Sequence, residues 1–198
     1  MTGRWMSGRW LSGRWLAALC LGLALSLAGA GAALADTTVS FYSHGWGVGT
    51  NGFLYFPHAF VVIRRTSPDG AAKQEAYGYT AASTTDITVL MHPSRGVVEE
   101  PNGTYRKHAT LHFTVTLTDA QYQALEARVA WWGAATSPLY NLDGHNCISF
   151  VADLASSIGL QVPDAGGRDP ARFLEGVKRL NGERLMAAAG APVTAPAQ

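Results

Sequence analysis

A single cysteine where a turn runs into a helix pattern constrains this chain more than any other feature. Turn-forming residues (Asn, Asp, Gly, Asn) fill 141–146, and an apolar stretch of helical period follows from Cys147. Asn146 can cap this helix, which places the sulfur in its first turn. The backbone N–H groups and the helix dipole favour negative charge there. We therefore expect the Cys147 thiol to be biased toward the thiolate and to act as a nucleophile.

Residues 1–35 have the pattern of a secretory signal peptide. Arg4, Arg9 and Arg14 lie in near-copies of a Gly-Arg-Trp unit, an apolar run covers 16–28, and small residues end in Ala-Leu-Ala at 33–35. The apolar run is shorter than the ~20 residues of a spanning helix. We expect cleavage near Ala35, a periplasmic or secreted product, and no stable membrane span afterwards. The repeat is also compatible with Met6 as the start codon in place of Met1.

The remaining chain is long enough for one domain, expected at 36–184, and 185–198 is predicted to be a disordered Ala/Pro tail. Three of the 15 basic residues and none of the 14 acidic ones precede residue 36, so the net charge after cleavage is about −2. No Lys/Arg stripe occurs, and nucleic acid is not an expected partner; a protein partner is unknown from the sequence. Cleavage also removes Cys20, so Cys147 is either a buried inert thiol or a reactive one.

The expected elements describe an α+β domain with a mostly antiparallel sheet packed with helices. Two strands joined by a Ser-Pro-Asp-Gly turn should form a hairpin, and a capping box at Thr118 should open a helix. Asn102-Gly103-Thr104 is interpreted as a turn between strands, and the next strand should bury Leu111 with Phe113. The strands are expected at 37–42, 58–65, 74–80, 86–91 and within 105–117, and the helices at 118–132, 147–158 and 170–180.

A cysteine nucleophile needs a base, which is usually a histidine close in space. His58 begins the most apolar strand, where a polar side chain is costly unless it is paired or functional. It is therefore the preferred base, and His44 is the second choice. His108 and His112 are interpreted as solvated residues, and His92 has no evident task. No histidine or cysteine spacing suits a metal site, no cofactor is expected, and the absence of a Gly-x-Ser-x-Gly turn argues against a serine triad.

Two stretches carry a family resemblance: Pro57-His58-Ala59-Phe60-Val61-Val62-Ile63, and later Tyr140-Asn141-Leu142 with Asn146-Cys147-Ile148-Ser149-Phe150-Val151. Together they resemble the circularly permuted branch of the NlpC-like papain superfamily, which includes permuted amidases and lecithin–retinol acyltransferase-like enzymes. The resemblance covers about 40–159 and implies a papain-like fold in which the histidine strand precedes the cysteine helix. It also implies Cys147 as the nucleophile and His58 as the general base.

The family's third polar residue, which orients the imidazole, has no unambiguous match, and we assign Glu75 with Tyr77 as its substitute. Backbone N–H groups at Cys147 should meet the oxyanion. The candidate substrate-binding residues are Tyr77, His145, Trp46 and Tyr140. The resemblance and the expected export imply a cysteine hydrolase (an amidase or thiol protease) that cleaves an amide in cell-wall peptidoglycan. The alternatives are a lipid acyltransferase or thioesterase on the same dyad, and a non-catalytic binding module with Cys147 buried.

Overall fold

The computed structural model describes residues 36–48, 54–67, 69–83, 92–101 and 103–189. The expected signal peptide, the strand at 86–91 and the last residues of the tail lie outside these ranges, so they stay predictions. Within the described ranges, no helix has both the length and the apolar character needed to cross a membrane.

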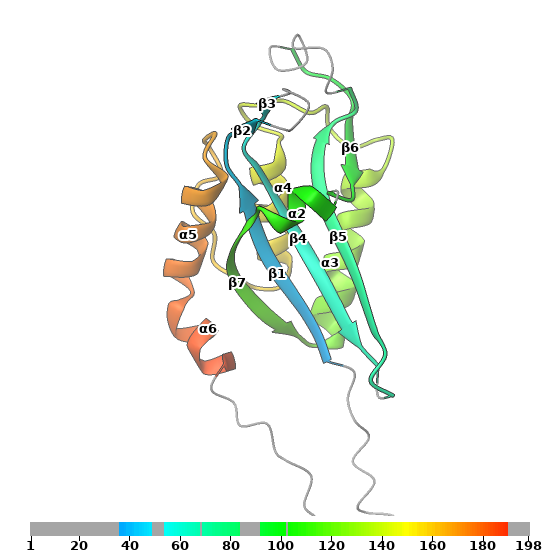
Figure 1. The fold of residues 1–198 in the computed structure, drawn as a ribbon, viewed down its shortest axis with the longest axis vertical. Helices are drawn as coiled ribbons and strands as arrows, with labels where there is room; N and C mark the ends of the chain where they lie inside the picture. Colours follow the sequence, from blue (N-terminus) through cyan, green and yellow to red (C-terminus); the bar gives the residue numbers. More distant parts are fainter. Residues whose placement is uncertain (1–35, 49–53, 68, 84–91, 102, 190–198) are drawn as a thin grey trace, which may run out of the picture. The chain divides into compact units, whose positions relative to one another are not determined.

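A five-stranded sheet in the order β6-β5-β4-β1-β7 forms the centre of the domain (Figure 1). All four neighbouring pairs are antiparallel, so the expected antiparallel sheet is confirmed. The β4–β5 hairpin is also confirmed, and its turn uses Gly70 at a positive φ of 84°. The strands are β1 (Asp36–His44), β4 (His58–Thr66), β5 (Ala72–Ala81), β6 (Gly96–Glu99) and β7 (Thr110–Leu117), and a separate pair joins β2 (Gly47–Val48) to β3 (Leu54–Tyr55).

Helices cover one face of this sheet. They are α3 (Asp119–Gly133), α4 (Cys147–Ser157), α5 (Pro170–Leu180) and α6 (Gly182–Ala189). Helix α4 packs on β4 and β5, and α5 packs on β1 and β7. The alternating side chains of β1 and β4 that face them are fully buried, as Val39, Phe41 and Val61 show. The α+β class and the order of histidine strand before cysteine helix are therefore confirmed.

The other face of the sheet carries a smaller apolar cluster. Phe60, Val62 and Ala76 are buried there, with Tyr42 and Tyr105 packed against them. Tyr105 belongs to the short helix α2 (Gly103–Lys107), whose green ribbon crosses the sheet in Figure 1. The sequence interpretation of 102–104 as a turn between strands was wrong, because Gly103 and Thr104 begin this helix.

Two further predictions were wrong, and each has a local cause. The pairing of β1 with β7 shifts by one residue after Phe41–Phe113, so that Tyr42 pairs with Leu111 and His112 is the extra residue of a bulge. Leu111 is consequently 50% exposed and His112 only 7% exposed, the reverse of what simple alternation implies. At the other end of the domain, α6 extends to Ala189 and Leu185 packs against the core, so 185–189 is helical and not part of a disordered tail.

Candidate active site

Cys147 begins helix α4, and the residue before it caps the helix as the sequence predicts. The Asn146 side-chain oxygen accepts hydrogen bonds from the N–H groups of Ile148 (2.8 Å) and Ser149 (3.2 Å). In the reciprocal hydrogen bond of the capping box, the Asn146 backbone N–H donates to Ser149 Oγ, with 2.8 Å between nitrogen and oxygen. This reciprocal cap fixes the direction of the first turn, and with it the position of the Cys147 side chain, which is only 6% exposed.

Three backbone N–H groups surround the Cys147 sulfur, those of Ala59, Cys147 and Ile148. Each of them favours the thiolate and lowers the pKa of the thiol. Burial acts in the opposite direction and is the larger cause, so it raises the pKa of Cys147 to about 11. The expected bias toward the thiolate was therefore wrong in its net direction, and the thiol is protonated at neutral pH.

The bond from Ala59 brings the start of β4 to the start of α4, two stretches that the sequence separates widely. Ala59 directly follows His58, but the two side chains point to opposite faces of the sheet, as alternation requires. Ala59 belongs to the helix-side core with Cys147. The His58 ring instead lies near Phe60 (6.5 Å between centroids) and Tyr105 (6.1 Å), which belong to the other face. The backbones of β4 and α4 therefore meet at Ala59 and Cys147, but the side chains of His58 and Cys147 lie on opposite faces of the sheet.

The position of Gly78 gives the same orientation for His58. A Cβ atom on Gly78 would lie 2.5 Å from His58 Nε2, so the imidazole occupies the space that a side chain would need there. Gly78 pairs with Phe60, which faces away from α4. In the described part of the chain, no hydrogen bond connects His58 with Cys147. Burial, with a smaller contribution from His44, lowers the pKa of His58 to about 4, so its ring is neutral at pH 7.

Glu75 does not orient His58, because the hairpin register places it elsewhere. Glu75 pairs with Ile63, five residues along β4 from His58, and forms an ion pair with Lys73 at 2.9 Å. Tyr77, its substitute, shares a hydrogen bond with Glu75 and packs against the helix-side core, away from the His58 ring. The register, continued two residues beyond the Phe60–Gly78 pair, leads to Thr80 as the polar residue level with His58.

Of the candidate substrate-binding residues, the structure places only Tyr140 beside Cys147. Tyr140 is 8% exposed, and burial together with the nearby Cys147 raises its pKa above the usual range. His145 stacks on Trp132 of α3 with ring centroids 4.0 Å apart, and its buried Nε2 has no hydrogen-bond partner among the described residues. Trp46 is 64% exposed and packs on Phe56, with ring centroids 5.2 Å apart. The expected site is therefore dispersed over the domain, except for Cys147 and Tyr140.

The structure also assembles a hydrogen-bonded set that the sequence interpretation missed. His112 Nε2 lies 2.8 Å from Ser43 Oγ, and His112 Nδ1 lies 2.7 Å from Glu175 Oε1. The three residues come from β1, β7 and α5. The bulge at His112 turns its ring toward the helices, so the interpretation of His112 as a solvated residue was wrong. The sequence gives no signal for this set, because His112 takes a polar position in the regular alternation of 111–117 and only the bulge turns it inward.

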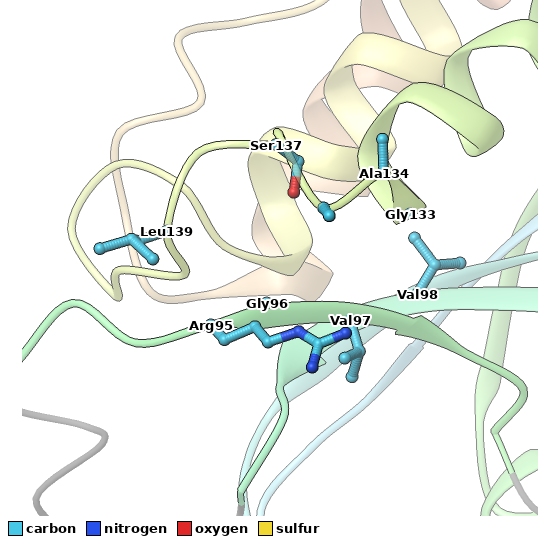
Figure 2. A pocket seen from close by; sticks show the side chains of 9 residues that line it. Arg95, Gly96, Val97, Val98, Gly133, Ala134, Ser137 and Leu139 are labelled. Carbon is cyan, nitrogen blue, oxygen red and sulfur yellow. The ribbon is translucent and has the colours of Figure 1, made fainter.

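A small pocket of about 140 Å³ lies between β6 and the segment that follows α3 (Figure 2). Arg95, Gly96 and Val98 line one side, and Gly133, Ser137 and Leu139 line the other, but none of the candidate site residues takes part. The pocket is smaller than the 300–1,000 Å³ that is typical for small-molecule sites. Among the described residues, no group of three His, Cys, Asp or Glu side chains could hold a metal ion.

Comparison with known proteins leaves the family open. No family model matches the sequence, and no curated protein matches it. Among solved structures, the type VI secretion system effector TseH is similar, with 14% identity and a TM-score of 0.46 over 73% of this chain and 88% of that chain. A match at this level establishes neither a family nor an activity.

Proposed function

We propose that the protein is a hydrolase that cleaves an amide bond through an acyl–cysteine intermediate on Cys147. The observation that carries this proposal is the interaction of the Ala59 backbone N–H with the Cys147 thiol, which brings the start of β4 to the start of α4. It places the thiol at a capped helix start, next to the strand end that bears His58. The family resemblance of these same two stretches supports the choice of His58 as the base.

The proposed chemistry starts from two neutral groups. The sulfur attacks the carbonyl carbon of the amide while its proton moves to the His58 imidazole, and the imidazolium then protonates the departing amine. Water repeats the sequence on the thioester and restores the free thiol. The N–H groups of Ala59 and Cys147 already face the sulfur, so they are suitable donors for the oxyanion that forms beside it.

This mechanism requires His58 to leave its present contacts. Its ring lies over Gly78, near Tyr105, on the face opposite α4. His58 is the first residue of β4, and pairing with β5 begins only at Phe60, so at His58 the strand pairs with β1 alone, through His44. The proposal therefore includes a local rearrangement of the backbone at the start of β4 that turns His58 toward Cys147 when substrate binds.

For the substrate, we propose a peptide amide in cell-wall peptidoglycan, cleaved in the periplasm or outside the cell. The support is the family resemblance and the signal-peptide pattern of residues 1–35. Acyl transfer or thioester cleavage on a lipid would use the same two residues. A second candidate function, a non-catalytic binding module, is favoured by one observation: the Cys147 thiol is buried and its pKa is about 11.

Purified peptidoglycan incubated with the protein tests the proposal, with the released fragments identified by mass spectrometry. Cys147→Ala should abolish release, and His58→Gln should lower the rate by about 100-fold or more, the usual contribution of a general base. His108→Gln, which changes an exposed histidine, is the matched control and should keep the full rate. Full turnover by folded Cys147→Ala would exclude the cysteine mechanism, and no turnover by the native protein on wall, lipid ester or thioester substrates would favour the binding module.

A further inference from the structure

The Ser43–His112–Glu175 set lies outside the proposed cysteine mechanism and has a chemical order of its own. Ser43 is 3% exposed at the end of β1, and His112 is 7% exposed on β7. Glu175 on α5 keeps 54% of its side chain exposed, so the set extends from the sheet to the surface. The two hydrogen bonds, 2.8 and 2.7 Å long, use different nitrogens of the same ring.

The partners of the ring determine where its proton lies. An ionised carboxylate can only accept hydrogen bonds, so His112 Nδ1 must carry the hydrogen that it shares with Glu175. The hydrogen bond from His112 holds the pKa of Glu175 below its usual value, in keeping with an ionised carboxylate. In the neutral ring, Nε2 is then the acceptor, and the Ser43 hydroxyl donates to it. The Ser43 hydroxyl therefore donates its proton toward His112 Nε2, while Glu175 accepts the hydrogen bond from Nδ1 of the same ring.

We propose that Ser43 is a second nucleophile, activated by His112 and oriented through Glu175, and that it forms an acyl–serine with small esters. Ser43 Oγ attacks the ester carbonyl while its proton passes to His112 Nε2, and the imidazolium gives that proton to the departing alkoxide. Water then attacks the acyl–serine with the same base, which releases a carboxylic acid and restores the hydroxyl. Glu175 touches only the imidazole, so it is a positioning residue.

The burial of the set defines the class of substrate. Two of its three residues are almost fully covered by the sheet and by α5, which packs on both β1 and β7. A polymer cannot reach the Ser43 hydroxyl through that cover, whereas an acetyl-sized group needs only a small local opening. The expected substrates are short acyl esters, in contrast to the extended amide substrate proposed for Cys147.

Strand β1 also provides a matched control in Ser40. Its hydroxyl lies 2.8 Å from the Thr114 hydroxyl, across the same pair of strands but without a histidine. Ser40 is more exposed than Ser43, so access alone would favour modification of Ser40. Preferential reaction at Ser43 would therefore have to come from His112.

The test uses the full chain carrying Cys147→Ala, which removes the cysteine mechanism from the experiment. The chain is treated with methanesulfonyl fluoride, an acetyl-sized reagent whose sulfur bonds to an activated serine oxygen as fluoride leaves, and the modified peptide is identified by mass spectrometry. We expect one adduct, on Ser43, that is lost in Ser43→Ala and unchanged in Ser40→Ala. His112→Gln should slow the modification by about 100-fold or more, because it removes the base.

Hydrolysis of p-nitrophenyl acetate by the same variants gives a second readout. Glu175→Gln should lower kcat for this hydrolysis and leave KM nearly unchanged, because the carboxylate holds the imidazole and does not touch the ester. Circular dichroism melting checks that each variant is folded. The proposal is overturned if Ser43 in the folded Cys147→Ala chain stays unmodified, or if folded His112→Gln reacts at the same rate. Since Cys147 is absent throughout, neither result bears on the amide hydrolase.

Discussion

His58, which is partly buried, and His112, which is buried, belong to the same sheet, but their rings have opposite surroundings. His112 has a hydrogen-bond partner on each nitrogen, one from β1 and one from α5. His58 has aromatic neighbours, and no hydrogen bond reaches its ring in the described structure. The apolar sequence around His58 correctly indicates a buried strand, but it does not indicate the partners of the ring. Those depend on register and on the bulge, which decide the face that each ring occupies.

The largest expected effect concerns the Cys147 thiol, which lies on the face of the sheet opposite the His58 ring. A thiol with a pKa of about 11 should be alkylated about 100-fold more slowly at pH 7 than an ordinary cysteine of pKa 9, because the thiolate reacts. The rate at Cys147 should keep rising about tenfold per pH unit beyond pH 9. Iodoacetamide labelling of the folded protein, followed at the Cys147 peptide, measures this.

The same chain in denaturant is the control, and its labelling rate should level off near pH 9. Rapid native labelling at pH 7 that His58→Gln slows would mean that the two residues share a proton in the resting protein. That result would make His58 resemble His112 and remove the contrast between them.

The second effect is the acid stability that His58 controls. Its pKa is about 4 in the folded chain and near 6.5 in the unfolded chain, so unfolding takes up a proton between these values. Stability should therefore fall as the pH drops from 6.5 to 4, by about 3 kcal/mol in total. Urea unfolding at several pH values measures this loss, and His58→Gln should remove most of it. If the free energy of unfolding of His58→Gln fell with pH as steeply as that of the native chain, the His58 ring would have to be solvated in the folded protein.

The smallest effect is expected at Glu175. The hydrogen bond from His112 lowers the pKa of this carboxyl from 4.5, so its contribution is present above pH 4.5 and is lost as the pH falls through the lower folded value. Because the side chain is 54% exposed, solvent screening keeps the contribution below about 1 kcal/mol. Urea unfolding of Glu175→Gln at pH 7 and pH 3 should show a difference from the native chain only at pH 7.

Local patterns in the sequence predicted much of the fold. The continuous apolar run of β4, the capping box at Thr118 and the Asn146 cap each depend on neighbours within a few residues, and each is confirmed. Helix α2 was missed because its five residues are too few to show a helical period. Helix α6 was missed because an alanine-rich segment with few large apolar residues resembles a tail.

The site was less predictable, because its geometry depends on contacts between distant strands. The family resemblance identified two stretches that do meet, at Ala59 and Cys147. It could not supply the register that pairs Glu75 with Ile63, nor the alternation that turns His58 away from α4. The sequence showed the Asn146 cap, and with it the backbone N–H groups that lower the pKa of the thiol. It did not show the burial of Cys147, which raises that pKa by more.

The bulge in β7 gives this strand two phases. Beyond it, Phe113, Val115 and Leu117 alternate inward in the ordinary way, whereas Leu111, just before it, faces solvent. Removing a single residue at this point would restore simple alternation and exchange the faces of the preceding side chains. The length of one strand segment, more than the identity of any residue in it, thus decides whether the interior of this domain contains an imidazole.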